Sequence, residues 1–376
     1  MKVLLTGGGT GGHIYPALAI ARRLKELHED VEILYVGTSR GLESKSVPEA
    51  GFAFKAIEME GFKRELSWTG IRYNLRSIYL FLNGIHQCKK IIKEFKPDIV
   101  LGTGGYVAAP VCFAASVLNI PTIIHEQNSV LGLTNKFLAH FVNKICICFP
   151  DIYDQLKKHV EKIEFTGNPR AQEVVDAKES FTENESLPFP LDRQQPTVLI
   201  VGGSRGARHI NEAFIEAYHL FANVDYQVIF VTGQVHYEEV LQELKETQPI
   251  KDDDSIVIVP YIEDMVHILG EVDLIVTRSG ATTIAEITAL GLPAILIPSP
   301  YVTADHQTQN ASSLVKNDAA RLIKEQDLTA FDLFHQVSEL MNDRKLRTSM
   351  SEAARELGRP DAADHVIAVM LDELNK

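Results

Sequence analysis

The sequence alternates along its whole length between short runs of aliphatic and β-branched residues and longer amphipathic segments, and this alternation restricts the chain to few architectures. Parallel strands need long crossover connections and are buried on both faces, so the pattern is typical of a parallel sheet covered by helices on both sides. Strands are expected near residues 2–6, 31–36, 98–102, 121–125 and 144–148, and again near 197–201, 226–231, 256–259, 273–277 and 294–297. The chain is therefore predicted to be an α/β protein with two doubly wound halves.

The length indicates more than one domain, because 376 residues exceed what one hydrophobic core usually serves. A polar, proline-bearing stretch without periodicity, residues 180–196, is typical of an exposed connection between domains. We therefore predict an N-terminal domain over residues 1–165, a linker over 166–196 and a C-terminal domain over 197–360, followed by a helix over 361–376.

Four glycine-rich turns follow expected strands, and they come in two matching pairs. The turn at residues 7–12 corresponds to the turn at 202–206, and the segment 98–105 is echoed by 273–280. In open parallel sheets, ligands bind beyond the carboxyl ends of the strands. The two halves are therefore expected to be related units that face a shared ligand-binding cleft.

The first of these turns formally satisfies the G-x-G-x-x-G pattern of dinucleotide-binding proteins. Such proteins carry an acidic residue at the end of the second strand, but residues 35–38 contain none, which disfavours an NAD-dependent oxidoreductase. Glycines still let backbone N–H groups approach an anion at a helix N-terminus. A phosphate or carboxylate is therefore expected near Gly11 and Gly12.

Two titratable residues near the turns are candidates for chemistry. His13 lies at the start of a helix, where the helix dipole favours the neutral imidazole that can accept a proton. Glu286 lies one to two turns inside a helix that follows Gly280, and a carboxylate there can accept both hydroxyls of a ribose. The amides within residues 305–310 can hydrogen-bond sugar hydroxyls.

Composition and charge exclude several classes of protein. With 45% hydrophobic and 23% charged residues, the chain is not disordered, collagenous or a coiled coil. Residues 1–165 carry 20 Lys and Arg against 16 Asp and Glu, whereas residues 166–376 carry 17 against 34, which gives the net charge of −13. A nucleic-acid-binding protein normally has a broad basic surface, so this class is disfavoured, while an anionic partner of the first half remains open.

The sequence also carries expectations about the cellular compartment. No window approaches the ~18 apolar residues of a membrane span, and the chain starts directly with a strand-like run rather than a signal sequence. We expect a soluble cytoplasmic chain. Its four cysteines are too few for a disulfide framework and are predicted to be reduced core residues.

Six groups of residues, in order along the chain, resemble the motifs of one enzyme family. They are Thr6–His13 with Pro16–Ala19, Gly104–Tyr106 with Pro110, His125–Asn128 with Gly132 and Asn135, Thr166–Pro169, Gly202–Ser204 with Gly206, Ala207 and Asn211, and Arg278–Gly280 with Glu286. Together they resemble the peptidoglycan N-acetylglucosaminyltransferases of the MurG family over essentially the whole chain.

The resemblance implies a GT-B fold, in which two Rossmann-like domains face a central cleft and the last helix returns to the N-terminal domain. It implies inverting transfer of GlcNAc from UDP-GlcNAc to the MurNAc of undecaprenyl-diphosphate-MurNAc-pentapeptide (lipid I), which gives lipid II for peptidoglycan synthesis. Such an enzyme would be a peripheral membrane protein at the cytoplasmic face of the cell membrane. The resemblance leaves open whether it also binds other cell-wall synthesis proteins. The alternatives are another lipid-directed UDP-sugar glycosyltransferase and a non-catalytic nucleotide-sugar-binding regulator.

The resemblance also implies roles for individual residues. It assigns the donor to Thr10, Gly11, Gly12, Asn128, Arg170, Ser204, Ile262, Ala281, Thr282, Thr283, Ile284, Ala285, Glu286 and Gln307, and the acceptor diphosphate to Gly11, Gly12, Gly104 and Gly105. His13 is the expected base. Arg170 follows Pro169 at once, whereas many relatives have an aliphatic residue between the two. The donor-side loops contain no D-x-D pair, so we expect neither a metal nor a cofactor.

A basic segment, residues 62–96, is the candidate for contact with a membrane. Its charged residues are eight basic ones, Lys63, Arg64, Arg72, Arg76, Lys89, Lys90, Lys93 and Lys96, and two acidic ones, Glu65 and Glu94. At 100° per residue, one apolar stripe is expected to face the core: Ile71, Leu75, Ile78, Leu82 and Ile85. Tyr73 and Leu80 are then expected on the outer face with Arg72 and Arg76, an arrangement that favours docking on anionic lipids.

Overall fold

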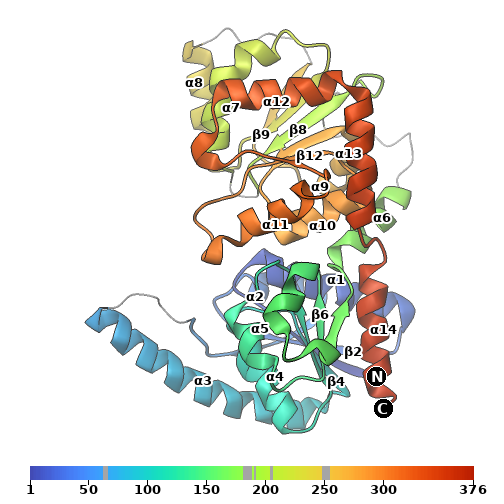
Figure 1. The fold of residues 1–376 in the computed structure, drawn as a ribbon. Helices are drawn as coiled ribbons and strands as arrows, with labels where there is room; N and C mark the ends of the chain where they lie inside the picture. The colour runs from blue at the N-terminus through green and yellow to red at the C-terminus, as the bar shows by residue number, and fades with distance from the viewer. Residues whose placement is uncertain (62–66, 181–188, 190–191, 204–205, 248–254) are drawn as a thin grey trace. The chain divides into compact units, whose positions relative to one another are not determined.

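The chain divides into two compact units, and the last helix belongs to the first of them. Unit 1 comprises Met1–Arg170 and Asp361–Lys376, and unit 2 comprises Ala171–Pro360. The computed structural model describes residues 1–376 except 62–66, 181–188, 190–191, 204–205 and 248–254 (Figure 1). The predicted linker 166–196 is thus divided between the units, because a helix begins at Arg170 and most of it clusters with unit 2.

Unit 1 is a parallel sheet with helices on both faces. Its strands are β1 (Lys2–Thr6), β2 (Glu32–Thr38), β3 (Ala53–Ile57), β4 (Ile99–Gly102), β5 (Thr122–Glu126), β6 (Lys144–Ile147) and β7 (Ile163–Phe165). Its helices are α1 (Gly11–Leu27), α2 (Glu43–Glu49), α3 (Trp68–Phe95), α4 (Ala108–Val117), α5 (Leu133–Leu138) and α14 (Ala362–Leu374), with 3-10 turns η1 (Pro150–Leu156) and η2 (Val160–Lys162). The strand order is β3-β2-β1-β4-β5-β6-β7.

Unit 2 repeats this architecture. Its strands are β8 (Thr197–Val201), β9 (Gln227–Val231), β10 (Ile256–Val259), β11 (Leu274–Thr277), β12 (Ala294–Leu296) and β13 (Arg321–Leu322), in the order β10-β9-β8-β11-β12-β13. Its helices are α6 (Arg170–Ser180), α7 (Arg208–Phe221), α8 (Tyr237–Thr247), α9 (Met265–Glu271), α10 (Ala281–Leu290), α11 (His306–Val315), α12 (Ala330–Asn342) and α13 (Arg344–Leu357), with 3-10 turns η3 (Thr303–Asp305) and η4 (Glu325–Asp327).

Both sheets are parallel, and their central strands are buried on both faces. In β1, Val3 pairs with Ile33 of β2 on one side and with Ile99 of β4 on the other, and all three side chains are buried. Strands in this position must be apolar at almost every residue, which is the pattern that the sequence shows. The prediction of two doubly wound α/β halves is confirmed.

Three strands were not expected from the sequence, and each lies at or near a sheet edge. They are β3, β7 and β13. The last two have only three and two residues, too few for a visible pattern. In β3 only Ile57 is fully buried, so the strand lacks the continuous apolar run of its central neighbours.

Helix α14 is fixed to unit 1 by a bidentate ion pair. The Arg23 side chain on α1 donates from Nε to Asp364 Oδ1 at 2.6 Å and from Nη2 to Oδ2 at 2.8 Å. Beneath this pair, Val366, Ile367 and Met370 enter the same hydrophobic cluster as the buried face of α1. The fork geometry matches a carboxylate and orients the helix.

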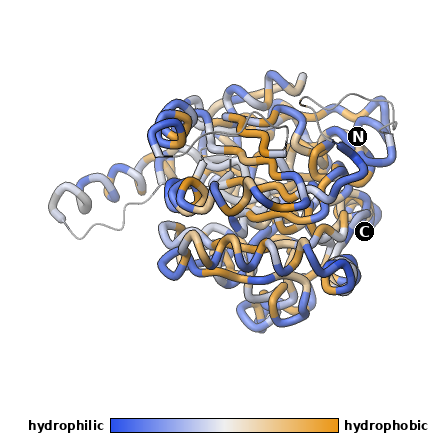
Figure 2. Tube along the Cα trace, turned by 90° about the horizontal axis from the view of Figure 1, so that it is seen from above, coloured by the Kyte–Doolittle hydropathy of each residue, from blue (hydrophilic) through white to orange (hydrophobic). Residues whose placement is uncertain are grey.

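The long helix α3 contradicts the face that the sequence analysis assigned to it. Its buried positions include Ser77, Leu80, Cys88 and Ile92, whereas Leu75, Ile78 and Leu82 are exposed by 63%, 46% and 61%. Figures 1 and 2 show the first turns of α3 projecting from the rest of unit 1. The helix has more apolar residues than one face can hold, so the apolar stripe alone did not identify the inner face. Its inner face includes Gly84, which packs against Pro110 of α4, and Cys88, which lies in the same hydrophobic cluster as α4.

Within the described ranges, no helix combines the length and the hydrophobicity that crossing a membrane requires. All four cysteines are free thiols, and three of them, Cys88, Cys112 and Cys146, are buried. Burial away from water raises the pKa of the Cys88 thiol to about 12, as expected for a core residue.

Candidate functional site

Both units place glycine-rich turns at the carboxyl ends of two adjacent central strands. In unit 1 the turns follow β1 and β4, and in unit 2 they follow β8 and β11. In each sheet the strand order reverses between these two strands, and this topological switch point is where open α/β sheets bind their ligands. Each unit therefore presents a candidate ligand site built from the turns that the sequence analysis singled out.

The two turns of unit 1 pack backbone against backbone. The Gly8 N–H donates to the Gly104 carbonyl at 3.3 Å, and Gly104 and Gly105 have φ values of 104° and 78°. A Cβ atom on Gly105 would lie 2.1 Å from the Gly8 oxygen, so only glycine fits there. The α1 N-terminus at Gly11 and Gly12 lies beside these turns, with the unpaired N–H groups of a first helical turn.

His13 is held against these turns with a defined tautomer. Its Nδ1 lies 3.1 Å from the Gly8 carbonyl oxygen and 3.3 Å from the hydroxyl of Thr10. A carbonyl oxygen only accepts, so in the neutral ring Nδ1 carries the hydrogen and Nε2 carries the lone pair. The ring lies over Gly104, where an added Cβ would be 2.9 Å from the His13 Cδ2 atom.

Glu43 holds the turn after β1 in place, although the sequence analysis did not select this residue. Its carboxylate is fully buried and accepts from the Gly9 N–H at 3.3 Å, the Thr38 N–H at 3.0 Å and the Thr38 hydroxyl at 2.6 Å. The end of the second strand has no acidic residue of its own, but Glu43 reaches back to it from the first residue of α2. Sequence spacing gives no signal for this contact.

Asn128 lies in a turn that a second buried carboxylate organises. Glu126 accepts from the Asn128 N–H at 3.1 Å, from the Gly132 N–H at 2.9 Å and from the Asn135 side-chain amide at 2.9 Å. The neighbouring Gln127 donates its amide to the Thr103 carbonyl at 2.8 Å. The Asn128 turn is therefore tied to the turn that carries Gly104.

His125 joins this turn to the segment that precedes Arg170. Its Nε2 donates to the Gly167 carbonyl at 2.9 Å, while Nδ1 accepts from the Gln127 amide at 2.9 Å. Complete burial lowers the pKa of His125 to about 4, against the weaker opposing effect of the Gly167 hydrogen bond. Arg170 itself begins α6, and its N–H donates to the Asn168 side chain at 3.2 Å.

In unit 2 the turn after β8 also requires glycine. Gly206 has a φ of 75°, and a Cβ atom there would lie 2.1 Å from the Thr232 carbonyl oxygen. Gly203 has a φ of 93°. Ser204, an expected donor contact, lies outside the described residues.

The expected donor stretch Ala281–Glu286 forms the first turns of α10. Gly280 caps the helix in an extended conformation. Ala281 and Ile284 are buried, whereas Thr283, Ala285 and Glu286 are half-buried. The Thr282 hydroxyl is buried without a hydrogen-bond partner in the part of the chain that the structure describes. Ile262, an expected donor contact, is buried three residues beyond the end of β10.

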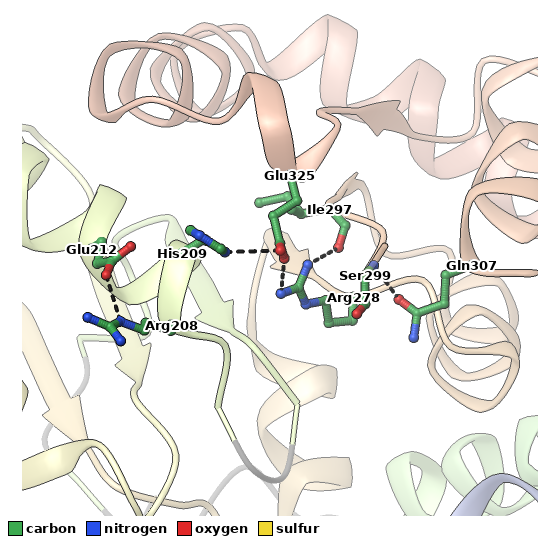
Figure 3. A network of polar contacts seen from close by, with 8 residues as sticks. All are labelled: Arg208, His209, Glu212, Arg278, Ile297, Ser299, Gln307 and Glu325. Carbon is green, nitrogen blue, oxygen red and sulfur yellow. Dashed lines mark hydrogen bonds and ion pairs between the residues drawn. The ribbon is translucent and has the colours of Figure 1, made fainter. Parts of the chain in front are cut away.

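A buried ion pair anchors the turn before α10 (Figure 3). Arg278 contacts the Glu325 carboxylate and donates to the Ile297 carbonyl at 3.0 Å. The same carboxylate lies 3.0 Å from His209 Nδ1 in the first turn of α7. The Glu325 side chain is 4% exposed. Glu325 thus connects the start of α7 with the turn before α10, the two helices that follow the glycine-rich turns of unit 2.

Gln307 is fixed to the same turn. Its side-chain oxygen accepts from the Ser299 N–H at 2.8 Å, and its carbonyl accepts from the Ser279 hydroxyl at 2.8 Å. Asn310, one turn further along α11, donates to the Ser279 carbonyl at 3.2 Å. These hydrogen bonds fix the conformation of the Gln307 side chain, so its amide nitrogen has a defined position next to the start of α10.

The structure brings the predicted residues together within each unit. Thr10–His13, Gly104, Gly105 and Asn128 share hydrogen-bonded turns in unit 1, and Gln307 joins the start of α10 in unit 2. Ile262 makes no hydrogen bond to that turn among the residues that the structure describes. Among the side chains that the structure describes, no three His, Cys, Asp or Glu residues gather as metal ligands.

Comparisons with known proteins agree with this architecture. The chain matches the glycosyltransferase family 28 N-terminal domain over residues 3–147 and the glycosyltransferase family 28 C-terminal domain over residues 197–366. The first match covers the sheet of unit 1 as far as β6, and the second covers the whole sheet of unit 2.

Full-length relatives carry one enzyme name. A protein of Limosilactobacillus reuteri is 50% identical over the whole of both chains, and one of Latilactobacillus sakei is 52% identical over 98% of this chain and 99% of its own. Both are named UDP-N-acetylglucosamine–N-acetylmuramyl-(pentapeptide) pyrophosphoryl-undecaprenol N-acetylglucosamine transferase. The crystal structure of Acinetobacter baumannii MurG superposes with a TM-score of 0.76 at 29% identity, covering 99% of each chain.

Proposed function

This chain belongs to glycosyltransferase family 28, within it to the MurG family, and we propose that it transfers GlcNAc from UDP-GlcNAc to the MurNAc of lipid I. The product is lipid II, the disaccharide-bearing lipid used in peptidoglycan synthesis. The observation that carries this proposal is identity of about half of all residues, over the full length, with transferases named for that reaction.

The chemistry needs a base for the incoming hydroxyl and compensation for charge on the leaving diphosphate. In our proposal His13 Nε2 takes the proton from the MurNAc hydroxyl as its oxygen bonds to the anomeric carbon and the bond to UDP breaks. Because Nδ1 holds the hydrogen against the Gly8 carbonyl, Nε2 has the lone pair that this step requires. Attack opposite the leaving group inverts the anomeric centre.

The donor side of the proposal rests on unit 2. The N-terminus of α10 offers backbone N–H groups to the UDP diphosphate, so negative charge can be stabilised by fixed dipoles. Glu286 would accept the ribose hydroxyls, and the free amide of Gln307 would contact the GlcNAc. Ser204 and Arg170 are further proposed donor contacts.

The acceptor side rests on unit 1. Gly11 and Gly12 start a helix beside the interlocked turn at Gly104 and Gly105, and this arrangement suits a diphosphate. Thr10 and Asn128, which are proposed donor contacts, are held by hydrogen bonds in the same set of turns.

The acceptor lipid requires contact with the membrane, and we assign that contact to the outer face of α3. Leu75, Tyr79 and Leu82 are exposed by 63%, 67% and 61%, and the exposed Arg72 and Arg76 lie on the same side of the helix. Apolar side chains enter the interfacial region while basic side chains attract anionic lipids, at ~1 kcal/mol for each basic residue. The enzyme would act at the cytoplasmic face as a peripheral protein.

Aromatic residues extend this apolar surface towards α5. Phe81 of α3 lies against Phe137 with ring centroids 6.1 Å apart, and Phe137 contacts Phe141 at 5.1 Å. Phe137, Phe141 and the nearby Leu133 are exposed by 39%, 43% and 74%. An apolar surface of this kind, on the unit proposed to bind the acceptor, favours interfacial docking.

Release of UDP from UDP-GlcNAc tests the proposal. Measured with and without undecaprenyl-diphosphate-MurNAc-pentapeptide, release is expected only with this acceptor, and UDP-GalNAc is expected to be a poor donor. Binding of UDP-GlcNAc without turnover would indicate a regulator instead. Turnover with diacylglycerol, but not with the MurNAc lipid, would indicate a different lipid-directed glycosyltransferase.

A further inference from the structure

Unit 2 has a pocket of about 330 Å³ at the amino ends of its strands, whereas the glycine-rich turns lie at their carboxyl ends. It is bounded by the end of α6, the end of α9, the connection from α10 to β12, and α13. Asp273 and Pro293, which directly precede β11 and β12, lie in its wall. The volume is within the range of small-molecule sites.

Basic side chains dominate this pocket. Lys178, Arg344, Arg347 and Arg355 line it, against the single carboxylate of Asp273. This composition contrasts with the surrounding half of the chain, where residues 166–376 carry 17 Lys and Arg against 34 Asp and Glu. Cations therefore gather at one place in an otherwise acidic part of the protein.

Two of the charged groups are already used within the fold. Arg347 donates to the Leu340 carbonyl at 2.8 Å and also to that of Met341, at the end of α12. Asp273 accepts from the Thr197 N–H at 2.9 Å. In contrast, Lys178, Arg344 and Arg355 form no ion pair with any residue in the described ranges.

The stems of two of these side chains are fixed by packing against glycines. The Arg355 side chain covers Gly291, the left-handed residue that ends α10, so closely that a Cβ there would lie 2.4 Å from its Cγ and Nε. Lys178 lies along Gly270, whose Cβ would be 3.6 Å from the Lys178 Cγ. The charged groups are thus directed to the pocket at a small cost in side-chain entropy.

The electrostatic balance of the pocket remains positive. The carboxyl ends of α6, α9 and α10 each contribute roughly half an elementary negative charge, and Asp273 contributes one more. The four cations of the pocket exceed this sum by roughly one and a half charges. Clustered cations repel one another, and an anion that bridges them relieves the repulsion.

From this geometry we propose that the pocket binds a small anion bearing phosphate groups, such as a diphosphate or a phosphorylated metabolite. Phosphate oxygens match the guanidinium forks of Arg344 and Arg355, and Lys178 adds a point charge. The site is distinct from the donor turns, since it lies at the other end of α10. The proposal does not rest on the glycosyltransferase reaction.

The test is calorimetric titration of inorganic pyrophosphate into the full-length protein saturated with UDP, so that the donor turns are occupied. Binding at up to two sites per chain is expected, because the turns of unit 1 proposed for the acceptor diphosphate remain open. The share of the pocket is the binding that removal of its cations weakens. The variant Lys178→Gln with Arg344→Gln should bind pyrophosphate about a hundredfold more weakly, at about tenfold per cation removed. The control Lys245→Gln with Lys316→Gln removes two exposed cations outside the pocket and should bind as the wild type does.

Each other outcome would overturn the proposal. No binding to the UDP-saturated wild type, or equal weakening in the pocket and control variants, would show that the pocket is not an anion site. Binding of an oligoglutamate peptide without binding of pyrophosphate would assign the surface to an acidic protein segment instead. UDP affinity and turnover without pyrophosphate should be unchanged in both variants, which separates this test from the proposed reaction.

Discussion

Three buried carboxylates hold the turns that carry the predicted binding residues. Glu43 fixes the turn at Gly9, Glu126 the turn at Asn128, and Glu325 the starts of α7 and α10. A buried carboxylate costs several kcal/mol unless hydrogen bonds or a cation compensate it, so each carboxylate strongly favours the one loop conformation that provides its partners. The turns are thereby preorganised for ligands.

Glu286 provides the sharpest residue-scale prediction for the donor. The variant Glu286→Ala should lose about 1.5–3 kcal/mol of UDP binding, because the ribose hydroxyls lose a charged acceptor. Calorimetric titration with UDP measures this loss, and Glu238→Ala, which removes an exposed carboxylate from α8, should leave affinity unchanged. Wild-type affinity in Glu286→Ala would exclude Glu286 from the donor site.

His13 is expected to act mainly in the transition state. The variant His13→Ala should lower kcat by about 10²–10⁴ while UDP affinity changes only a few-fold, because a base contributes little to ground-state binding. The exposed His28 at the end of α1 offers a matched control, and His28→Ala should leave kcat unchanged. A variant with normal kcat and weak donor binding would make His13 a ligand rather than the base.

His125 should make stability depend on pH. Its pKa is about 4 in the folded chain and about 6.5 when unfolded, so the unfolded chain binds more protons between these values. The contribution is fully present above pH 6.5 and is lost as the pH falls towards 4, by about 2–3 kcal/mol between pH 7 and pH 4.5.

Urea unfolding at several pH values checks this, since His125→Gln should show a shallower decline than the wild type in that window. An NMR titration of the wild-type imidazole gives a second measurement. Titration near pH 6.5 would contradict the buried, neutral imidazole.

At the scale of elements, the amphipathic pattern of α3 predicted a helix and a membrane-facing surface but not which face is outside. The helix is apolar on more than one side, and its inner side uses Ser77, Gly84 and Cys88 where large residues were expected. Close packing against α4 selects small residues, which a hydrophobicity pattern does not register.

This reassignment predicts different effects for two neighbouring leucines. The variant Leu80→Ser should lower the free energy of unfolding by about 2–4 kcal/mol, because Leu80 is 7% exposed. The variant Arg72→Glu with Arg76→Glu and Leu82→Ser should unfold as the wild type does but lose at least about thirtyfold in affinity for anionic vesicles.

Sedimentation with phosphatidylglycerol vesicles measures that loss. The matched control Lys157→Glu with Lys158→Glu reverses two exposed charges after η1 and should sediment normally. Unchanged sedimentation of the α3 variant would show that this face is not the membrane contact.

The elements themselves were largely predictable, and the contacts of the site were only partly so. Central strands are buried on both faces and therefore give continuous apolar runs, whereas β7 and β13 are too short to give a pattern. Glycine turns such as Gly104–Gly105 are visible in a sequence because no other residue fits them. The roles of Glu43 and Glu325 are not visible in the sequence, because tertiary packing and not sequence spacing determines their hydrogen-bond partners.

At the scale of the whole molecule, the two units share strand order and the placement of their glycine turns but differ in charge. Unit 1 has the outer face of α3 and the turns proposed for a lipid-linked diphosphate, while the acidic second half has the turns proposed for UDP-GlcNAc. Unit 1 carries 22 Lys and Arg against 20 Asp and Glu, whereas unit 2 carries 15 against 30. An anionic membrane surface therefore repels unit 2 more strongly than unit 1. The charge asymmetry is therefore expected to orient the protein on the membrane.

The most direct test of the central claim is mass spectrometry of the lipid product. Incubation of the wild type with UDP-GlcNAc and undecaprenyl-diphosphate-MurNAc-pentapeptide should convert the lipid to a species heavier by one N-acetylhexosamine residue, with a β-linkage to the MurNAc by NMR. His13→Ala should give little of this product in the same time. An acceptor lipid of unchanged mass, with UDP-GlcNAc bound but intact, would contradict the account.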